Sequence, residues 1–304
     1  MTGSAQHALF VHAHPDDESI NNAATMAKYV AAGIGVTLVT CTAGEMGEVL
    51  VPELEHLAHD RDDKLADQRK VELANAMAEI GVTDHRFLGG FGKYRDSGMQ
   101  WHEDGHAIAA DTIHDNAFWN ADLTEAADDL VAVIREVRPQ VLVTYDQFGN
   151  YGHPDHIQAH RVATYAAALA AVPSYRTDLG EAHDIAKVYW VAMSESWMRE
   201  GLRAMRAAGD ETTFEGMDPE GQLPPFVTAD ENLAAMVDGT EFHEQKMRAL
   251  AAHATQITTD GPFFALSNNA GSQAWGYEFY RIAKGATAAP YDEKGLETDL
   301  FNGL

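Results

Sequence analysis

Short apolar runs alternate along the chain with longer segments in which apolar residues recur at helical spacing. The apolar runs predict buried strands at residues 8–13, 36–42, 85–89, 141–145 and 187–193. The helical patterns predict helices at residues 19–32, 61–80, 123–137, 155–171 and 194–208. Strands that alternate with helices favour right-handed crossovers between parallel strands. We therefore expect an α/β fold of Rossmann-like type, with a mostly parallel sheet and helices on both faces.

Two segments break this alternation. Residues 89–121 are polar and show little periodicity, and a loop of this length in a compact domain is usually functional or mobile. Residues 209–225 are rich in Gly, Pro and acids, and they are the best candidate for a mobile flap or subdomain edge. We expect residues 1–172 to form a Rossmann-like catalytic core. Residues 173–304 are expected to complete the sheet as a C-terminal α+β extension and to form a subdomain that covers the substrate.

The tripeptide His-Pro-Asp occurs twice, at residues 14–16 in "FVHAHPDDESI" and at residues 153–155 in "GNYGHPDHIQAH". Each copy follows a predicted strand and precedes a predicted helix, the second after a loop at residues 146–152. In open parallel sheets, ligand sites lie outside the carboxyl ends of the strands, above all where the strand order reverses. Both copies lie within the expected core, and we expect them to face one another across one crevice.

Histidine and carboxylate side chains are concentrated around both tripeptides. The first region offers His12, His14, Asp16, Asp17 and Glu18, and the second offers His153, Asp155, His156 and His160. A catalytic zinc site takes about three such ligands and leaves a position open for water. His14 and Asp17 are spaced to converge on one ion while Asp16 points elsewhere, and a histidine of the second region would complete the set. Ferrous iron suits the same kind of ligand set.

Taken singly, these residues have simpler explanations. His12 is expected to face the core with its hydrogen bonds satisfied. Asp17 and Glu18 would favour a helix N-terminus electrostatically, and Asp155 could cap the next helix. Six His or Asp residues at two strand ends exceed what capping requires, so the sequence favours a metal site. No phosphate-binding loop, nucleophile elbow or H-E-x-x-H motif competes with it.

Composition narrows the class of protein further. The 304-residue chain has 45% hydrophobic and 22% charged residues, so it can bury a sizeable core. Its formal net charge of −26 repels nucleic acids and anionic membranes, and no run approaches the roughly 20 apolar residues of a membrane span. Cys41 is the only cysteine, which agrees with a reducing compartment. We expect a cytoplasmic protein with a small-molecule partner, and the sequence gives no oligomeric state.

At the level of motifs, "AHPDDE" together with "GHPDH" resembles the zinc-dependent deacetylases of the LmbE/PIG-L family, which act on N-acetylglucosaminyl conjugates. Further similar segments are "TCTAGEMGEV", "GGFGKYRDSGM", "RPQVLVTYDQFGNYGHPDH", "ALAAHATQ", "ALSNN" and "ETDLF". They span most of the chain, whereas residues 174–226 carry no matching motif. Within the family, the combination is similar to the branch that deacetylates N-acetylglucosaminyl-inositol in mycothiol biosynthesis.

The resemblance implies one zinc ion on His14, Asp17 and His156. Asp16 would be the general base that accepts a proton from the attacking water. This agrees with elementary chemistry, because zinc can activate water and polarise an amide oxygen, but a nearby carboxylate must still receive the proton.

The same resemblance gives three residues a part in stabilising the charge that develops on the substrate during the reaction. His153 would be positively charged and would stabilise the oxyanion or protonate the leaving amine. Asp155 would orient His153 and favour its charged form, since a carboxylate raises the pKa of a neighbouring histidine. Tyr151 would be a mobile residue that adds a hydrogen bond to the oxyanion.

Substrate contacts are also implied. Asp96 matches a sugar-binding carboxylate, and Arg69 matches a basic residue that grips hydroxyls. The alternative for Arg69 is an exposed helix residue that pairs with Glu72 or another acid. His253 and Gln256, on the helix that carries "ALAAHATQ", would either support the site from behind or have a plain core or surface role.

Other functions remain open at this point. A mycothiol S-conjugate amidase of the same family cleaves a larger amide, and it tends to carry a Lys shortly after "HPDDES", where this chain has Ser19-Ile20-Asn21-Asn22. A non-catalytic sugar- or metal-binding protein would have lost Asp16 or His153, and both are present. A ferrous oxygenase would have little use for Asp16.

Overall fold

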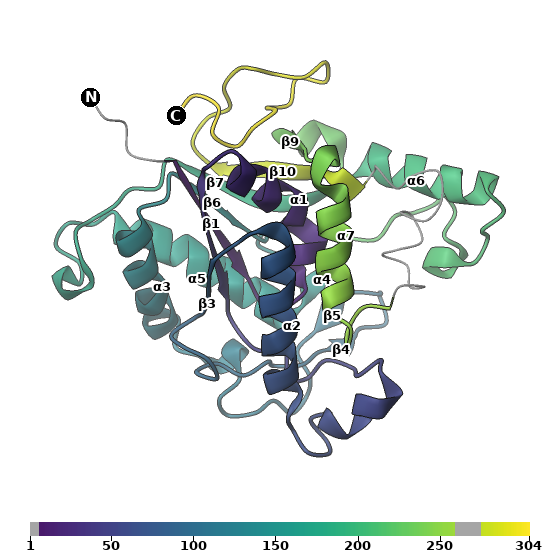
Figure 1. The fold of residues 1–304 in the computed structure, drawn as a ribbon, viewed down its shortest axis with the longest axis horizontal. Helices are drawn as coiled ribbons and strands as arrows, with labels where there is room; N and C mark the ends of the chain where they lie inside the picture. Colours follow the sequence, from purple (N-terminus) through teal and green to yellow (C-terminus); the bar gives the residue numbers. More distant parts are fainter. Residues whose placement is uncertain (1–5, 259–274) are drawn as a thin grey trace.

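One mixed sheet organises the computed structural model, which describes residues 6–258 and 275–304; the "ALSNN" segment lies outside them. Within those residues the sheet has eight strands, seven of them in the order β3-β2-β1-β6-β7-β10-β9, while β8 pairs with β7 (Figure 1). The strands are β1 (His7–His12), β2 (Gly35–Thr40), β3 (Asp84–Phe87), β6 (Val141–Thr144), β7 (Lys187–Ser194), β8 (Val227–Thr228), β9 (Ala235–Asp238) and β10 (Tyr277–Lys284).

The parallel part of the sheet is built around β1. This strand pairs in parallel with β2 on one side and with β6 on the other, and β3 and β7 extend the two sides in parallel. The strand order therefore reverses between β1 and β6, the two strands that precede the His-Pro-Asp tripeptides. β10 runs antiparallel between β7 and β9. The expected α/β class is confirmed, with an antiparallel edge added by the C-terminal part of the chain.

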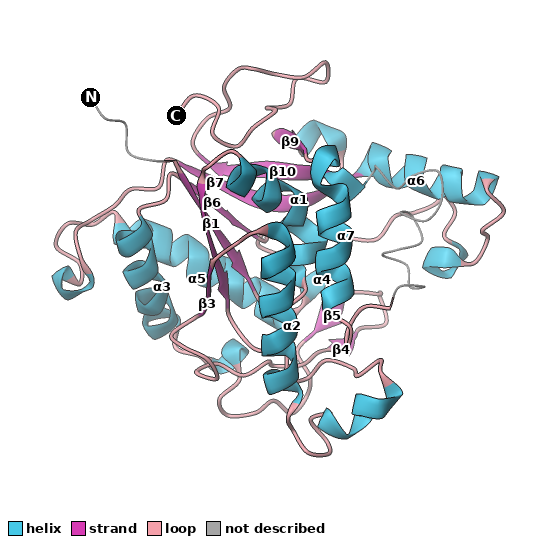
Figure 2. Ribbon diagram, in the orientation of Figure 1, coloured by secondary structure: helices cyan, strands magenta, loops and turns pink. Residues whose placement is uncertain are grey.

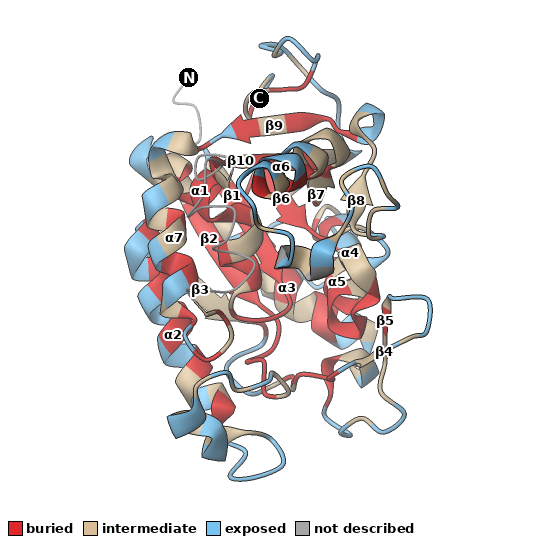
Figure 3. Ribbon diagram, turned by 90° about the vertical axis from the view of Figure 1, so that its right-hand side faces the viewer, coloured by how far each residue is buried: buried red, intermediate tan, exposed pale blue. Residues whose placement is uncertain are grey.

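Helices cover both faces of this sheet (Figure 2). On one face, α1 (Asp17–Ala31), α2 (Leu65–Ile80) and α7 (His243–Ala252) pack against one another. On the other face, α3 (Leu123–Val137) packs against α5 (Pro154–Ala170). The strands are buried between these layers, whereas α2 and α7 expose their outer sides, as Figure 3 shows. This layering is the reason that the apolar runs of the central strands are nearly continuous rather than alternating.

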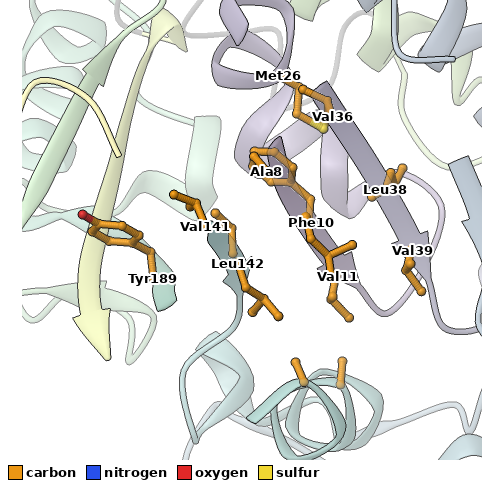
Figure 4. Packing of buried hydrophobic residues seen from close by; sticks show 14 of the residues in the cluster. Ala8, Phe10, Val11, Met26, Val36, Leu38, Val39, Val141, Leu142 and Tyr189 are labelled. Atoms are coloured by element: carbon orange, nitrogen blue, oxygen red, sulfur yellow. The ribbon is translucent and has the colours of Figure 1, made fainter. Parts of the chain in front are cut away.

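Close packing of aliphatic and aromatic side chains fixes the central strands. Phe10 and Val11 of β1 lie between Leu38 of β2 and Leu142 of β6, and all four are fully buried (Figure 4). Burying such a side chain stabilises the fold by about 1.5–3 kcal/mol relative to leaving it exposed. The strand ends that carry the polar motifs are therefore held by a rigid core.

Several boundaries differ from the predicted ones. The helix expected at residues 61–80 begins at Leu65, because the residues before it are exposed and charged and Asp63 adopts a positive φ of 53°. The loop at residues 89–121 contains a hairpin of β4 (Gln100–Trp101) and β5 (Ala107–Ile108), and such short strands leave no periodic signal. The short helix α4 (Gly149–Gly152) lies in the loop expected at residues 146–152.

Candidate active site

The first tripeptide forms the turn between β1 and α1. Asp16 is the last residue before the helix, and its backbone has φ 108° and ψ −34°, a region that non-glycine residues rarely occupy. Its carbonyl accepts hydrogen bonds from the N–H groups of Ser19 and Ile20, both at 2.9 Å. Its own N–H donates to Glu18 Oε2 at 2.9 Å. These bonds fix the turn at Asp16, and His14, Asp16 and Asp17 line one pocket.

The second tripeptide follows β6 through α4, where Asn150 has a positive φ of 63°. His153 caps α5, and its Nδ1 accepts the N–H of Asp155 at 3.1 Å. The Nε2 atom of neutral His153 therefore carries the ring proton. His156 follows one turn into the helix and stacks on Tyr145, with 4.2 Å between the ring centroids.

The structure brings His14, Asp17 and His156 together. Asp17 lies between the two rings, with 3.4 Å from Oδ2 to His14 Nδ1 and 3.4 Å from Oδ1 to His156 Nε2. The two contacts use different Asp17 oxygens, and each has about the 3.4 Å that separates neighbouring ligand atoms of a tetrahedral zinc ion. His153 lies close as well, because His14, His153 and His156 each offer a nitrogen within 4.8 Å of the others.

The surroundings of His14 also fit a metal ligand. Its second ring nitrogen, Nε2, lies 3.2 Å from Asp155 Oδ2. Metal-binding histidines usually donate their other ring N–H to a carboxylate in this way, which fixes the ring orientation. Burial lowers the pKa of His14, but Asp96 and Asp155 outweigh it and raise that pKa well above the usual value. A concentration of buried carboxylates that favours positive charge at this point is suited to a divalent cation.

Asp16 lies beside this set without belonging to it. Its carboxylate accepts a hydrogen bond from Arg69 Nη2 at 2.9 Å. Burial raises the pKa of Asp16 to about 6, against the opposing charge of Arg69. A carboxylate with a pKa near 6 is ionised at neutral pH and still basic enough to accept a proton, which suits a general base.

Arg69 is buried rather than exposed, and the acid that it pairs with is Asp16 rather than Glu72. Its side chain is 3% exposed and donates to the carbonyls of Gly44, at 2.9 Å, and Pro15 in addition to Asp16. Glu72 accepts instead from Gln68 and from Thr255. Arg69 lines the pocket, so a substrate contact is still sterically open to it.

Asp155 contacts His153 through its backbone N–H, whereas its carboxylate has other partners among the described residues. The Asp155 carboxylate accepts the N–H of Ser97 at 2.9 Å and the Ser97 hydroxyl, and it faces His14. The loop that carries Ser97 therefore supplies two hydrogen bonds to the Asp155 carboxylate. Burial, followed by the charges of His14 and His156, holds the pKa of His153 well below its usual value. This direction is opposite to the charged His153 that the resemblance implies.

A pocket of about 670 Å³ opens above these residues. The polar residues that line it include Asp16, Asp96 and His153, together with the three candidate metal ligands. Tyr151 lines it as well. Asp96 is buried and accepts the N–H groups of Gly98, at 2.8 Å, and Met46, at 3.2 Å. The Tyr151 ring lies 5.2 Å from that of His156 and 5.9 Å from that of Trp101. The end of the segment 209–225 reaches the same pocket, which is lined by Pro224, Pro225 and the next residue, Phe226.

One feature of the site, Ser97, has no signal in the sequence, whereas Gln256 and His253 were both expected as possible supports. Ser97, which orients Asp155, is one of many serines in polar loops. Gln256 lies beyond the end of α7 rather than on it, and its side chain donates to the carbonyl of Glu48 at 3.0 Å and lines the pocket. His253, also just beyond α7, is fully buried against Glu18.

Comparison with known proteins agrees with this geometry. The family profile described as "PIG-L: GlcNAc-PI de-N-acetylase" matches residues 9–167, which include both tripeptides. The chain belongs to the PIG-L family. Among curated PIG-L relatives, a protein of Nocardioides sp. is 75% identical over 98% of this chain and 99% of its own length. A protein of Kribbella flavida is 64% identical over 97% of each chain. Both are named 1D-myo-inositol 2-acetamido-2-deoxy-alpha-D-glucopyranoside deacetylase.

Solved structures share the PIG-L fold at lower identity. N,N'-diacetylchitobiose deacetylase from Pyrococcus horikoshii has a TM-score of 0.60 at 19% identity, and the match covers 93% of this chain and 85% of that one. The zinc-inhibited form of teicoplanin deacetylase Orf2 has a TM-score of 0.54 at 19% identity, with 91% and 97% covered. Within residues 6–258 and 275–304, no helix is both long and apolar enough to span a membrane.

Proposed function

We propose that this chain hydrolyses the acetamide of 1D-myo-inositol 2-acetamido-2-deoxy-alpha-D-glucopyranoside, releasing acetate and glucosaminyl-inositol in mycothiol biosynthesis. The observation that carries the proposal is the 75% identity, over nearly the whole of both chains, to a relative named for that reaction. The buried His and Asp cluster at the switch point of the sheet supports it, because amide hydrolysis needs water activation and charge stabilisation at one place. A cytoplasmic location fits the free, buried Cys41.

One zinc ion on His14, Asp17 and His156 is part of the proposal. The 3.4 Å spacings and the Asp155 carboxylate behind His14 support this set. When bound there, zinc would lower the pKa of a water molecule and polarise the amide oxygen of the substrate. Ferrous iron suits the same two histidines and one carboxylate, so the experiment below compares protein loaded with each of the two metals.

Residues of the chain carry out the proton transfer and stabilise the charge that develops on the substrate. Asp16 accepts the proton of the attacking water and returns it to the leaving amine nitrogen when the C–N bond breaks, and Arg69 keeps Asp16 ionised before the attack and aimed at the pocket. His153 acts as a neutral hydrogen-bond donor through Nε2–H to the oxygen that gains charge, since its Nδ1 is already occupied by the N–H of Asp155. Tyr151 adds a second donor from the wall of the pocket, and Asp155 orients His14 in place of His153.

The substrate is held by residues from both parts of the chain. Asp96 and Arg69 are the proposed contacts to sugar and inositol hydroxyls, because charged side chains make strong hydrogen bonds to hydroxyl pairs. Residues 173–304 supply an apolar wall that includes Met193, Pro224 and Phe226. This wall is the proposed substrate-covering part, next to the catalytic core at residues 1–172.

The decisive experiment compares amides. Purified protein loaded with zinc, and separately with ferrous iron, would be incubated with the N-acetylglucosaminyl-inositol substrate and with a mycothiol bimane conjugate, and kcat/KM would be measured from the free amine released. We expect the N-acetyl substrate to have the higher kcat/KM. A preference for the conjugate would assign the amidase function, and tight sugar binding without amine release would indicate a non-catalytic binding protein.

A further inference from the structure

A buried histidine from the C-terminal part of the chain reaches the turn that carries Asp16. His253 Nε2 lies 2.8 Å from Glu18 Oε1, although 235 positions separate the two residues. Both side chains are 0% exposed. The hydroxyl of Ser19 donates to the same Glu18 oxygen at 2.6 Å. The contact therefore joins the end of α7 to the first turn of α1 inside the protein.

The second oxygen of Glu18 holds the backbone of Asp16. Glu18 Oε2 accepts the Asp16 N–H at 2.9 Å, at the residue whose φ is 108°. A non-glycine residue in a sparsely populated backbone region costs about 1–3 kcal/mol and persists only where its surroundings over-determine it. The Glu18 carboxylate is one of these determinants, and its position depends in turn on its partners at Oε1.

Removing His253 would take away a buried partner of Glu18 Oε1 and so weaken the position of the carboxylate that holds the Asp16 N–H. A buried carboxylate that loses its charged or donating partner is strongly destabilised, and it moves toward water or toward other donors. Glu18 is fully buried among the described residues. Its carboxylate therefore has few other hydrogen-bond donors to turn to and cannot reach solvent. The Asp16 N–H would then lose its acceptor, and the carboxylate of Asp16 would shift relative to the pocket.

We propose that His253 is a positioning residue that acts through Glu18 to hold the backbone of Asp16 in its strained conformation. The His253 side chain does not line the pocket, and among the described residues its ring nitrogen Nε2 contacts Glu18 and Ser19, so its effect is on the orientation of the base. The inference rests on the proposed function, in which Asp16 is the base. It also gives the segment "ALAAHATQ" a role in the reaction, because that segment places His253.

The chain contains a matched control for this architecture. Lys246 of α7 pairs with Glu278 at 2.7 Å, and both side chains are 2% exposed. Glu278 accepts the backbone N–H groups of Ala24 and Thr25 in α1, at 3.1 and 2.8 Å. Both pairs therefore join α7 to a backbone N–H group in or just before α1, but only the His253 pair acts on Asp16. A general loss of packing between α7 and α1 would affect both pairs.

The test compares His253→Leu and His253→Gln with Lys246→Met in the full chain loaded with metal. We expect His253→Leu to lower kcat about 10- to 100-fold, less than the roughly 10²–10⁴-fold of a lost general base because Asp16 is displaced rather than removed, while KM and bound zinc change less than about twofold. His253→Gln keeps a donor to Glu18 and should recover most of kcat. Lys246→Met should lower the melting temperature without changing kcat of the folded protein.

Hydrogen exchange of the Asp16 amide provides a readout that does not depend on turnover. We expect exchange at Asp16 to become at least about tenfold faster in His253→Leu and to stay slow in His253→Gln and Lys246→Met. Unchanged exchange and unchanged kcat in His253→Leu would overturn the inference, and so would an equal loss of kcat in Lys246→Met. If His253→Leu does not fold, a folded His253→Gln with fast Asp16 exchange and low kcat overturns it. Failure of the wild-type protein to deacetylate would instead overturn the proposed function and leave the exchange result intact.

Discussion

Arg69 donates a hydrogen bond to the carboxylate of Asp16 at 2.9 Å, across 53 positions of the sequence. Two backbone carbonyls hold the same guanidinium, so its charge stays fixed beside the candidate base. The charge opposes the effect of burial and keeps the pKa of Asp16 as low as about 6. We therefore expect Arg69→Met to raise that pKa by about 1–3 units, as loss of an adjacent opposite charge does.

This change should be visible in the pH profile of the variant. At pH 7 the ionised fraction of Asp16 would fall about tenfold if its pKa rose by about two units. We expect kcat/KM of Arg69→Met to fall by about that factor at pH 7 and to recover partly at higher pH. The matched control is Arg135→Met, because Arg135 is also buried and, within the described residues, donates to backbone carbonyls alone, such as those of Tyr175 and Val172. An unchanged profile in Arg69→Met would contradict the proposed effect on Asp16.

The wild-type protein should itself lose activity in acid. A general base works only when ionised, so kcat/KM is expected to fall as the pH drops through about 6, where Asp16 becomes protonated. Below that point the decrease should approach tenfold per pH unit. Measurement of kcat/KM from pH 5 to 9, with bound metal checked at each pH, separates protonation of Asp16 from loss of the metal. A profile that stays flat to pH 5 would exclude Asp16 as the base.

The parallel core followed from the sequence, and so did the meeting of the two His-Pro-Asp tripeptides at one pocket. The strand and helix alternation predicted β1, β2, β6 and β7 within one or two residues of their observed ends. His12 was expected to be a satisfied core residue, and its ring nitrogens lie 2.7 Å from Asn22 Oδ1 and 3.1 Å from Tyr145 Oη. The antiparallel edge was not predicted, because β9 and β10 are stabilised mainly by their pairing with β7 and with each other.

Which residues belong to the site was easier to predict from the sequence than which of those residues contact one another. The composition around Arg69, in "DQRKVEL", reads as a solvated helix face, and only the packing of α2 beneath the turns at Pro15 and Gly44 makes it a buried residue. In the same way, Asp155 adjoins His153 in sequence, but the loop at Ser97 directs its carboxylate to His14. A sequence places charges near a strand end, and the packing of separate loops decides which charges touch.

Replacement of Asp16 by Asn tests the base directly. Asn has nearly the same shape and can still accept a hydrogen bond from Arg69, but it cannot accept a proton. We expect Asp16→Asn to bind as much zinc as the wild-type protein and to lose about 10²–10⁴-fold in kcat. Metal analysis and steady-state kinetics on the same preparation check both parts. A variant with wild-type kcat would exclude this role.

His156 should be required for the metal, whereas another histidine on the same helix should not. Its Nε2 lies 3.4 Å from Asp17 Oδ1 in the candidate ligand set. His160, one turn further along α5, instead contacts the carbonyl of Tyr145 through Nδ1 at 3.0 Å. We expect His156→Ala to bind zinc at least about 100-fold more weakly, and His160→Ala to bind it normally. Equal zinc affinity in the two variants would mean that the ligand set is different.

Glu297 should anchor the C-terminal tail to the sheet without affecting the site. Its carboxylate is 0% exposed and accepts from Lys187 Nζ at 2.6 Å, Tyr189 Oη at 2.5 Å and the N–H of Ala288 at 2.7 Å. Glu297→Gln would leave the charge of Lys187 buried without its counter-ion, which typically costs about 3–5 kcal/mol. We expect that loss in the free energy of unfolding measured with urea, and a kcat unchanged in the folded protein. The exposed Glu293→Gln is the control, and equal stability of the two variants would show that the buried pair contributes little.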